Sequence, residues 1–124
     1  LGTQALRDLV RQGKQRIKAG FCVVIFPEGT RMAPGAIKEY QIGGAFLACN
    51  TNCAVTPVAH NAGTLWTKNA ILKRPGVITI SVGPKISPAG LTPRQLTRKV
   101  EMWIQNETSR LDRAKEKADR PAIE

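Results

Sequence analysis

The chain has 124 residues, 42% of them apolar and 23% charged, which fits one globular domain or part of one and excludes a disordered segment. Its 19 lysines and arginines outweigh 9 acidic residues, and the net charge of +10 indicates an anionic partner: a phosphate ligand, an acidic membrane surface or nucleic acid. No apolar stretch approaches the ~20 residues that a membrane-spanning helix needs, and an odd number of cysteines argues against a secreted disulfide framework.

The first third of the chain predicts a helix, a buried strand and a loop. Apolar residues at helical spacing predict a helix over Gln4–Lys18, which Gly20 closes. The continuous apolar run Phe21–Phe26 is rich in β-branched residues and is typical of a strand covered on both faces, as in a parallel sheet. Turn-forming residues then predict a loop over Pro27–Tyr40.

The middle of the chain predicts one helix and two further strands. Small and apolar residues over Gly43–Asn50 indicate a tightly packed helix. Strands are expected at Ala54–Ala59, which Pro57 interrupts, and at Val77–Val82. This order of helices and strands predicts an α/β fold.

The C-terminal part predicts a long helix with a marked start. Thr92 is the expected N-cap, Pro93 suits the first helical position, and Gln95 completes a capping box. One face is apolar, with Trp103 beside it, and is formed by Leu96, Val100, Ile104 and Leu111. We expect residues 1–113 to form the folded unit and the charged residues 114–124 to fray.

The expected first strand runs directly into Pro27–Arg31, a segment suited to binding phosphate. Ligands of open α/β sheets collect beyond the carboxyl ends of the strands. Gly29 allows a positive φ or a close backbone approach, Thr30 offers a hydroxyl, and Arg31 offers a planar fork for a phosphate. The spacing predicts a phosphate clasp, although it also fits an ordinary surface turn with a solvated arginine.

The hexapeptide Phe26–Arg31 resembles the third conserved block of the glycerolipid acyltransferases that carry a His-x-x-x-x-Asp dyad. The likeness covers Ala5 to Leu111 and is strongest to bacterial 1-acylglycerol-3-phosphate acyltransferases. It continues in order and spacing through Ala33–Gly35, Tyr40–Ala45, Val55–Ala59 (similar to the fourth block), Trp66, Leu72–Gly76 and Val82–Pro84. It implies an α/β fold with a mixed sheet flanked by helices, incomplete at the N-terminus.

Members of this family move a fatty acyl group from acyl-CoA or acyl carrier protein to a glycerol phosphate. The resemblance therefore implies lysophosphatidate as acceptor, phosphatidic acid as product and no further cofactor. In the family, the histidine of the dyad is the general base and the aspartate orients it. This chain has one histidine, His60, followed five residues later by Leu65, so no catalytic residue is assigned. We expect a structural role for His60, an inactive chain on its own, and an excerpt of a longer protein, since the chain begins at Leu1 without methionine.

The substrate-binding residues that the resemblance implies are Glu28, Gly29, Thr30 and Arg31. Arg31 is expected to contact the phosphate of lysophosphatidate. Glu28 is expected to anchor the loop or the glycerol end by hydrogen bonding rather than to act as a base.

Two prolines near the expected site have predicted structural roles, and Gln41 departs from the family pattern. Pro27 and Pro57 are expected to be structural, with Pro57 shaping a strand end near the acyl-donor site. Relatives commonly carry lysine or arginine where this chain has Gln41, so one phosphate-side charge is either missing or supplied by Lys38.

The stretch from Ala54 to Gly90 carries four cations and no acid. It predicts a surface for anionic lipid headgroups, although a soluble basic loop fits it too. The candidate membrane residues are Trp66, Lys68, Lys73 and Arg74. The expected location is the cytoplasmic face of the (inner) membrane, peripheral or anchored through an N-terminal region.

Three other functions were weighed. A nucleic-acid module is not expected, because aromatic interleaving, zinc spacing and a helix-turn-helix signature are missing from the sequence. A metal site is not expected either, because Cys49, Cys53 and His60 lack a usual fourth ligand. A non-catalytic fragment that binds phospholipid or phosphate remains the open alternative to an acyltransferase.

Overall fold

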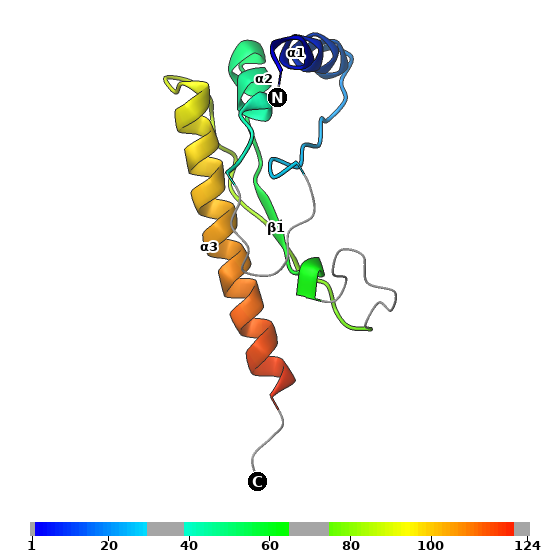
Figure 1. Cartoon of the computed structure of the whole chain (residues 1–124), viewed down its shortest axis with the longest axis vertical. Coiled ribbons are helices and arrows are strands. Elements are labelled where there is room, and N and C mark those ends of the chain that lie inside the picture. Colours follow the sequence, from blue (N-terminus) through cyan, green and yellow to red (C-terminus); the bar gives the residue numbers. More distant parts are fainter. Residues whose placement is uncertain (1, 30–38, 65–74, 121–124) are drawn as a thin grey trace.

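The computed structural model describes residues 2–29, 39–64 and 75–120. In chain order the elements are α1 (Thr3–Lys18), α2 (Gly43–Thr51), β1 (Val58–His60), the short 3-10 helix η1 (Ala62–Thr64), β2 (Ile80–Val82) and α3 (Pro93–Asp119). Figure 1 shows α3 running along the β1–β2 ribbon, with α1 and α2 gathered at the end of the molecule where α3 begins.

Helix α1 ends where the sequence predicts, and for the expected reason. Gly20 adopts φ +90°, and its N–H donates to the carbonyl of Ile17 at 3.0 Å. The N–H of Phe21 donates to the carbonyl of Arg16, also at 3.0 Å. This pair of bonds is a Schellman motif, which satisfies carbonyls that the helix itself leaves free.

The predicted strand at Phe21–Phe26 is wrong. The segment has no regular secondary structure, and the only ladder within the described ranges joins β1 to β2. Phe21, Val24 and Phe26 are 60%, 78% and 72% exposed. The apolar run encodes a preference for burial, but a strand also needs a neighbouring backbone to pair with.

The two later strands exist, although they are shorter than predicted and form an antiparallel ribbon. The register places Val58 opposite Val82, Ala59 opposite Ser81 and His60 opposite Ile80. β1 begins only after Pro57, which has no N–H to donate to a ladder. The carbonyl of Pro57 still accepts a hydrogen bond from the N–H of Gly83 at 2.9 Å.

Helix α3 begins with the predicted capping box. The Thr92 hydroxyl accepts from the N–H of Gln95 at 3.2 Å, and the Gln95 side-chain oxygen accepts from the N–H of Thr92 at 3.0 Å. Pro93 occupies the first helical position. On the predicted apolar face, Leu96 is fully buried and Leu111 is 4% exposed.

The core lies where α2 meets the first turns of α3. Ala45 and Ala48 of α2 pack with Leu96, and Cys49 and Val100 border this cluster. The Cys49 thiol lies 3.7 Å from the carbonyl oxygen of Leu91. Cys49 therefore acts as a small, partly buried filler beside this cluster.

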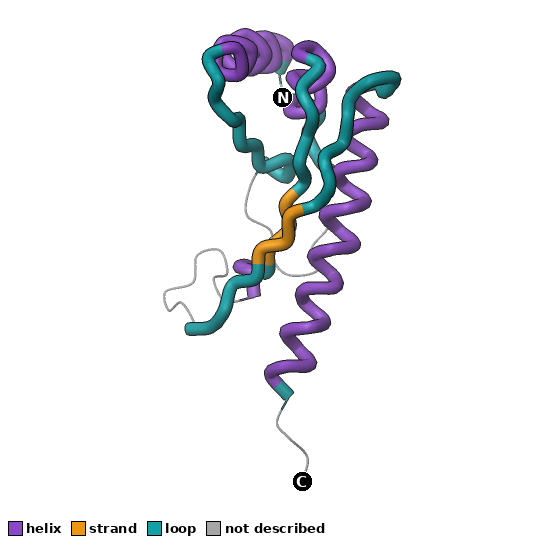
Figure 2. The backbone as a smooth tube through the Cα atoms, turned by 180° about the vertical axis from the view of Figure 1, so that it is seen from behind, coloured by secondary structure: helices purple, strands orange, loops and turns teal. Residues whose placement is uncertain are grey.

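Helix α3 also covers one face of the ribbon. A Cβ atom on Gly83 would lie 2.6 Å from Cζ2 of the Trp103 indole, so the helix approaches too closely for any side chain there. On the same side, the Ser81 hydroxyl donates to the Glu107 carboxylate at 2.8 Å. The opposite face of the ribbon stays open, with Ile80 and Val82 well exposed. In Figures 1 and 2 the irregular segment after α1 lies on the side of the ribbon away from α3.

The start of the expected frayed tail is helical. α3 continues past residue 113 to Asp119, and Lys115 forms an ion pair with Asp119 at 2.6 Å, one helical turn apart. Such a pair supports the last turns of a helix. The division into a folded unit and a tail stays a prediction.

Candidate functional site

Two short segments, Pro27–Gly29 and Tyr40–Gln41, lie against each other, and we call them the loop neck. The N–H of Gln41 donates to the carbonyl of Pro27 at 2.8 Å. In the sequence the two segments flank residues 30–38, which belong to the stretch that we predicted as a loop.

Gly29 takes the positive φ that its residue type allows. Its φ is +75°, a conformation that favours glycine, and the backbone is approached closely. A Cβ atom at this position would lie 2.6 Å from Nε2 of Gln41. The Gln41 amide thus lies over Gly29, at the position where a phosphate-side cation was expected.

Tyr40 is the buried residue of the loop neck, with 8% of its surface exposed. Burial raises the pKa of Tyr40 well above its ordinary 10.0, and the nearby carboxylates of Glu28 and Glu101 act in the same direction. The predicted role of Glu28, anchoring the loop or the glycerol end, stays a prediction.

Seven residues with predicted roles lie outside the described residues. They are the phosphate-side candidates Thr30, Arg31 and Lys38, and the membrane candidates Trp66, Lys68, Lys73 and Arg74. Their predicted roles stay predictions.

Pro57 and His60 occupy structural positions. A Cβ atom on Gly83 would lie 3.0 Å from Cγ of Pro57, so the proline packs against the ribbon where Trp103 also lies. His60 is exposed, pairs with Ile80 in the ladder, and accepts a hydrogen bond on Nδ1 from the N–H of Ala62 at 3.2 Å. This contact agrees with the structural role expected for His60.

The described part of the chain contains neither a metal-binding cluster nor a helix suited to cross a membrane. Within residues 2–29, 39–64 and 75–120, no three histidine, cysteine or acidic side chains gather closely enough to hold a metal ion. Over the same ranges, no helix has both the length and the apolar character to cross a bilayer.

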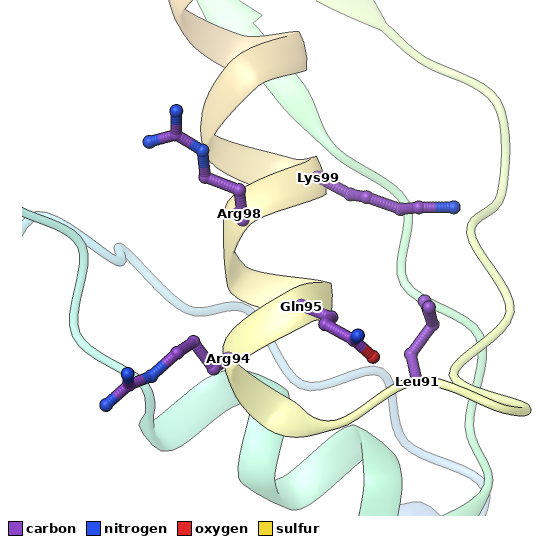
Figure 3. Close-up of a pocket in the computed structure, with 5 residues that line it drawn as sticks. All are labelled: Leu91, Arg94, Gln95, Arg98 and Lys99. Atoms are coloured by element: carbon purple, nitrogen blue, oxygen red, sulfur yellow. The ribbon is translucent and has the colours of Figure 1, made fainter.

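A shallow hollow of about 470 Å³ lies on the first turns of α3. Arg94 and Arg98 project to one side of the helix, while Lys99 and Leu91 project to the other (Figure 3). Arg98 lies 3.8 Å from Glu101, which is a loose ion pair. The sequence carries the signal for this basic surface, because no acidic residue occurs between Glu39 and Glu101, well beyond the limits that we assigned to the acid-free stretch.

Comparison with known proteins connects this geometry to a family. The family model described as Acyltransferase matches residues 3–61, which include the loop neck and β1. A 1-acyl-sn-glycerol-3-phosphate acyltransferase of Pseudomonas aeruginosa is 36% identical over 120 residues, covering 94% of this chain and 47% of that relative. A Cocos nucifera protein of the same name is 26% identical over 99 residues, covering 79% of this chain and 32% of its own length. The chain spans less than half the length of these curated relatives.

A solved structure also has a fold similar to that of this chain. The crystal structure of the 1-acyl-sn-glycerophosphate (LPA) acyltransferase PlsC from Thermotoga maritima matches with a TM-score of 0.76 at 22% identity, covering 92% of this chain and 46% of that one. The predicted fold class, an α/β fold of the glycerolipid acyltransferase type, is confirmed. By its fold, the chain is thus of the acyltransferase class. Within that class it belongs to the 1-acyl-sn-glycerol-3-phosphate acyltransferase family.

Proposed function

We propose that this chain forms the acceptor-binding part of an enzyme that transfers a fatty acyl group to 1-acylglycerol 3-phosphate, giving phosphatidic acid. The acyl donor is acyl-CoA or acyl carrier protein. The observation that carries the proposal is the loop neck, where Gln41 bonds to Pro27 and lies over Gly29. The loop between these points holds Arg31, whose guanidinium is suited to a phosphate.

The proposed division of labour follows from the chemistry of acyl transfer. The acceptor hydroxyl attacks the thioester carbonyl, an ester bond forms, the carbon–sulfur bond breaks, and the proton of the hydroxyl passes through a base to the leaving thiol. The chain's one histidine, His60, accepts on Nδ1 from the N–H of Ala62, and no His-x-x-x-x-Asp run occurs in the sequence. The base and its orienting carboxylate would come from a His-x-x-x-x-Asp run in a longer protein. On this proposal the chain alone is inactive.

The distribution of charge supports binding of this acceptor at a membrane surface. Lysophosphatidate is a membrane lipid, and the acid-free stretch from Tyr40 to Val100 supplies seven cations. Each cation near an anionic bilayer contributes about 1 kcal/mol of attraction. We therefore place the site at the cytoplasmic face of the membrane, with Trp66, Lys68, Lys73 and Arg74 and the basic hollow of α3 toward the headgroups.

A non-catalytic fragment that binds lipid phosphate is the second candidate. It is favoured by the fact that the loop neck forms within this chain, without a dyad. The first candidate predicts acyl transfer and the second does not, whereas both predict binding of a lipid phosphate.

The deciding experiment compares this chain with a chimera. In the chimera, the chain replaces the matching residues of the Pseudomonas aeruginosa relative, which supplies the remaining half of the protein. Transfer of labelled acyl groups from acyl-CoA and from acyl carrier protein to 1-acylglycerol 3-phosphate is then measured for both. We expect turnover by the chimera and none by the chain alone. A folded chimera without turnover would favour the non-catalytic candidate.

A further inference from the structure

We propose that one face of helix α1 is a docking surface for an acidic protein, and that this protein is the carrier-protein form of the acyl donor. The face is a row of four cations, Arg7, Arg11, Lys14 and Lys18, which we call the basic stripe. The inference rests on the proposed function and deepens it, because it names acyl carrier protein as the donor that this chain receives.

The four cations of the basic stripe lie on one side of α1. Their spacing of four, three and four residues places them within about 60° of one another around an ideal helix, and the stripe is about 16 Å long. The only acid of α1, Asp8, forms a loose ion pair with Arg11 at 3.4 Å, and the Arg11 side chain stays 64% exposed. The stripe therefore keeps a net positive charge.

The stability of the helix does not account for the basic stripe. Cations in the last turn, such as Lys18, stabilise the C-terminus of a helix through its dipole. That effect is confined to the last turn and does not extend to Arg7 and Arg11. Neighbouring members of the stripe are like charges one turn apart, which repel each other along a helix. An external row of acidic groups would relieve this repulsion.

The apolar side of α1 is already used by the fold. Gly13 is buried, and a Cβ atom on it would lie 2.5 Å from Cδ2 of Leu47, so α1 packs closely on α2. Figures 1 and 2 show α1 at one end of the molecule, lying across α2. A helix that binds in the surface of a bilayer inserts its apolar face among the lipids. Because α1 buries that face against α2, it offers charge to a partner without a face to insert.

The shape beside the stripe also fits a protein. A hollow of about 530 Å³ lies between α1 and the end of α2, and its lining includes Arg11, Lys14, Ile17, Lys18 and Thr51. Ile17 is half-buried, so the hollow combines an apolar contact with cations around it, as protein interfaces do. An acidic helix can present carboxylates one turn apart along the whole stripe. CoA instead concentrates its charge in a few phosphates, and a bilayer surface is flat on this scale.

The binding arm of the test measures the affinity of the 124-residue chain for acyl carrier protein without its acyl group, at low salt. Arg11→Glu/Lys14→Glu reverses two central charges of the stripe and should weaken binding about tenfold or more. The difference should disappear at about 1 M salt, where the Debye length is about 3 Å. Equal binding by the wild type and this variant would overturn the proposal.

The control variant is Arg113→Glu/Lys117→Glu, which reverses two exposed cations on the last turns of α3 and should bind like the wild type. A loss equal to that of the stripe variant would mean that only net charge matters. If the stripe variant does not fold by circular dichroism, Arg11→Gln/Lys14→Gln takes its place, with Arg113→Gln/Lys117→Gln as control.

Vesicles that contain phosphatidylglycerol are the competing partner in the same assay. We expect the stripe variant to lose more affinity for the carrier protein than for these vesicles. An equal or larger loss toward the vesicles would show that the stripe binds lipid or anions in general, and the proposal would be wrong.

The turnover arm uses the chimera with the Pseudomonas aeruginosa relative. Arg11→Glu/Lys14→Glu should raise KM for the acylated carrier protein about tenfold and leave KM for acyl-CoA as in the unsubstituted chimera. Equal effects on the two donors would contradict the docking role. If the chimera has no turnover, the proposed function fails, and the binding arm still reports whether α1 docks the carrier protein.

Discussion

Helix α3 and the segment Phe21–Phe26 are both marked by apolar residues, yet within the described residues α3 buries part of its apolar face while the segment has no strand partner and stays largely exposed. Leu96 of α3 is fully buried, whereas Val24 is 78% exposed. α3 carries its own start signal and needs only a face to pack against. A strand needs a second backbone as well. A segment can therefore specify a helix through its own residues, whereas a strand also depends on a neighbouring backbone.

The largest effect is expected for Leu96→Ala. The side chain packs against Ala45 and Ala48 with none of its surface exposed. Truncation leaves a cavity and should lower the free energy of unfolding by about 3 kcal/mol. Denaturant unfolding of the wild type and of Leu96→Ala measures this loss.

Met102→Ala is the control for that loss, because Met102 lies on the same helix and is 52% exposed. It should cost less than about 1 kcal/mol. Equal losses for the two variants would mean that α3 does not pack on α2 as described.

The smallest effect is expected for Val24→Ser. Since the Val24 side chain is mostly exposed and its segment has no strand partner in the described chain, the substitution should change the free energy of unfolding by no more than about 0.5 kcal/mol. The measurement is the same unfolding experiment on the 124-residue chain. A loss of about 2 kcal/mol would show that the segment is buried in solution, and the contrast with α3 would disappear.

The elements that follow the sequence prediction are those with local signals. The capping box at Thr92 and Gln95 and the closure at Gly20 are each encoded within a few residues, so both helix ends were predictable. The strands depend on pairing between distant residues, and Pro57 delays the first of them. A continuous apolar run such as Phe21–Phe26 indicates that the segment prefers to be buried. It does not indicate which neighbouring backbone would pair with the segment.

The features of the candidate site also divide into those that the sequence could predict and those that only the fold shows. The positive φ of Gly29 could be expected from its residue type. The burial of Tyr40 could not, because a single tyrosine at the end of a predicted loop forms no pattern. The position of the Gln41 amide over Gly29 also needs the fold.

The central claim is that the loop closed by this neck binds the acceptor phosphate through Arg31. The most direct measurement is the acceptor kcat/KM of the chimera with Arg31→Ala, with Arg113→Ala on the exposed surface of α3 as the charge-matched control. Losing a bidentate charged contact should lower kcat/KM for 1-acylglycerol 3-phosphate by about 30-fold or more, and the control should leave it unchanged. Equal acceptor use by the wild type and Arg31→Ala would contradict the claim.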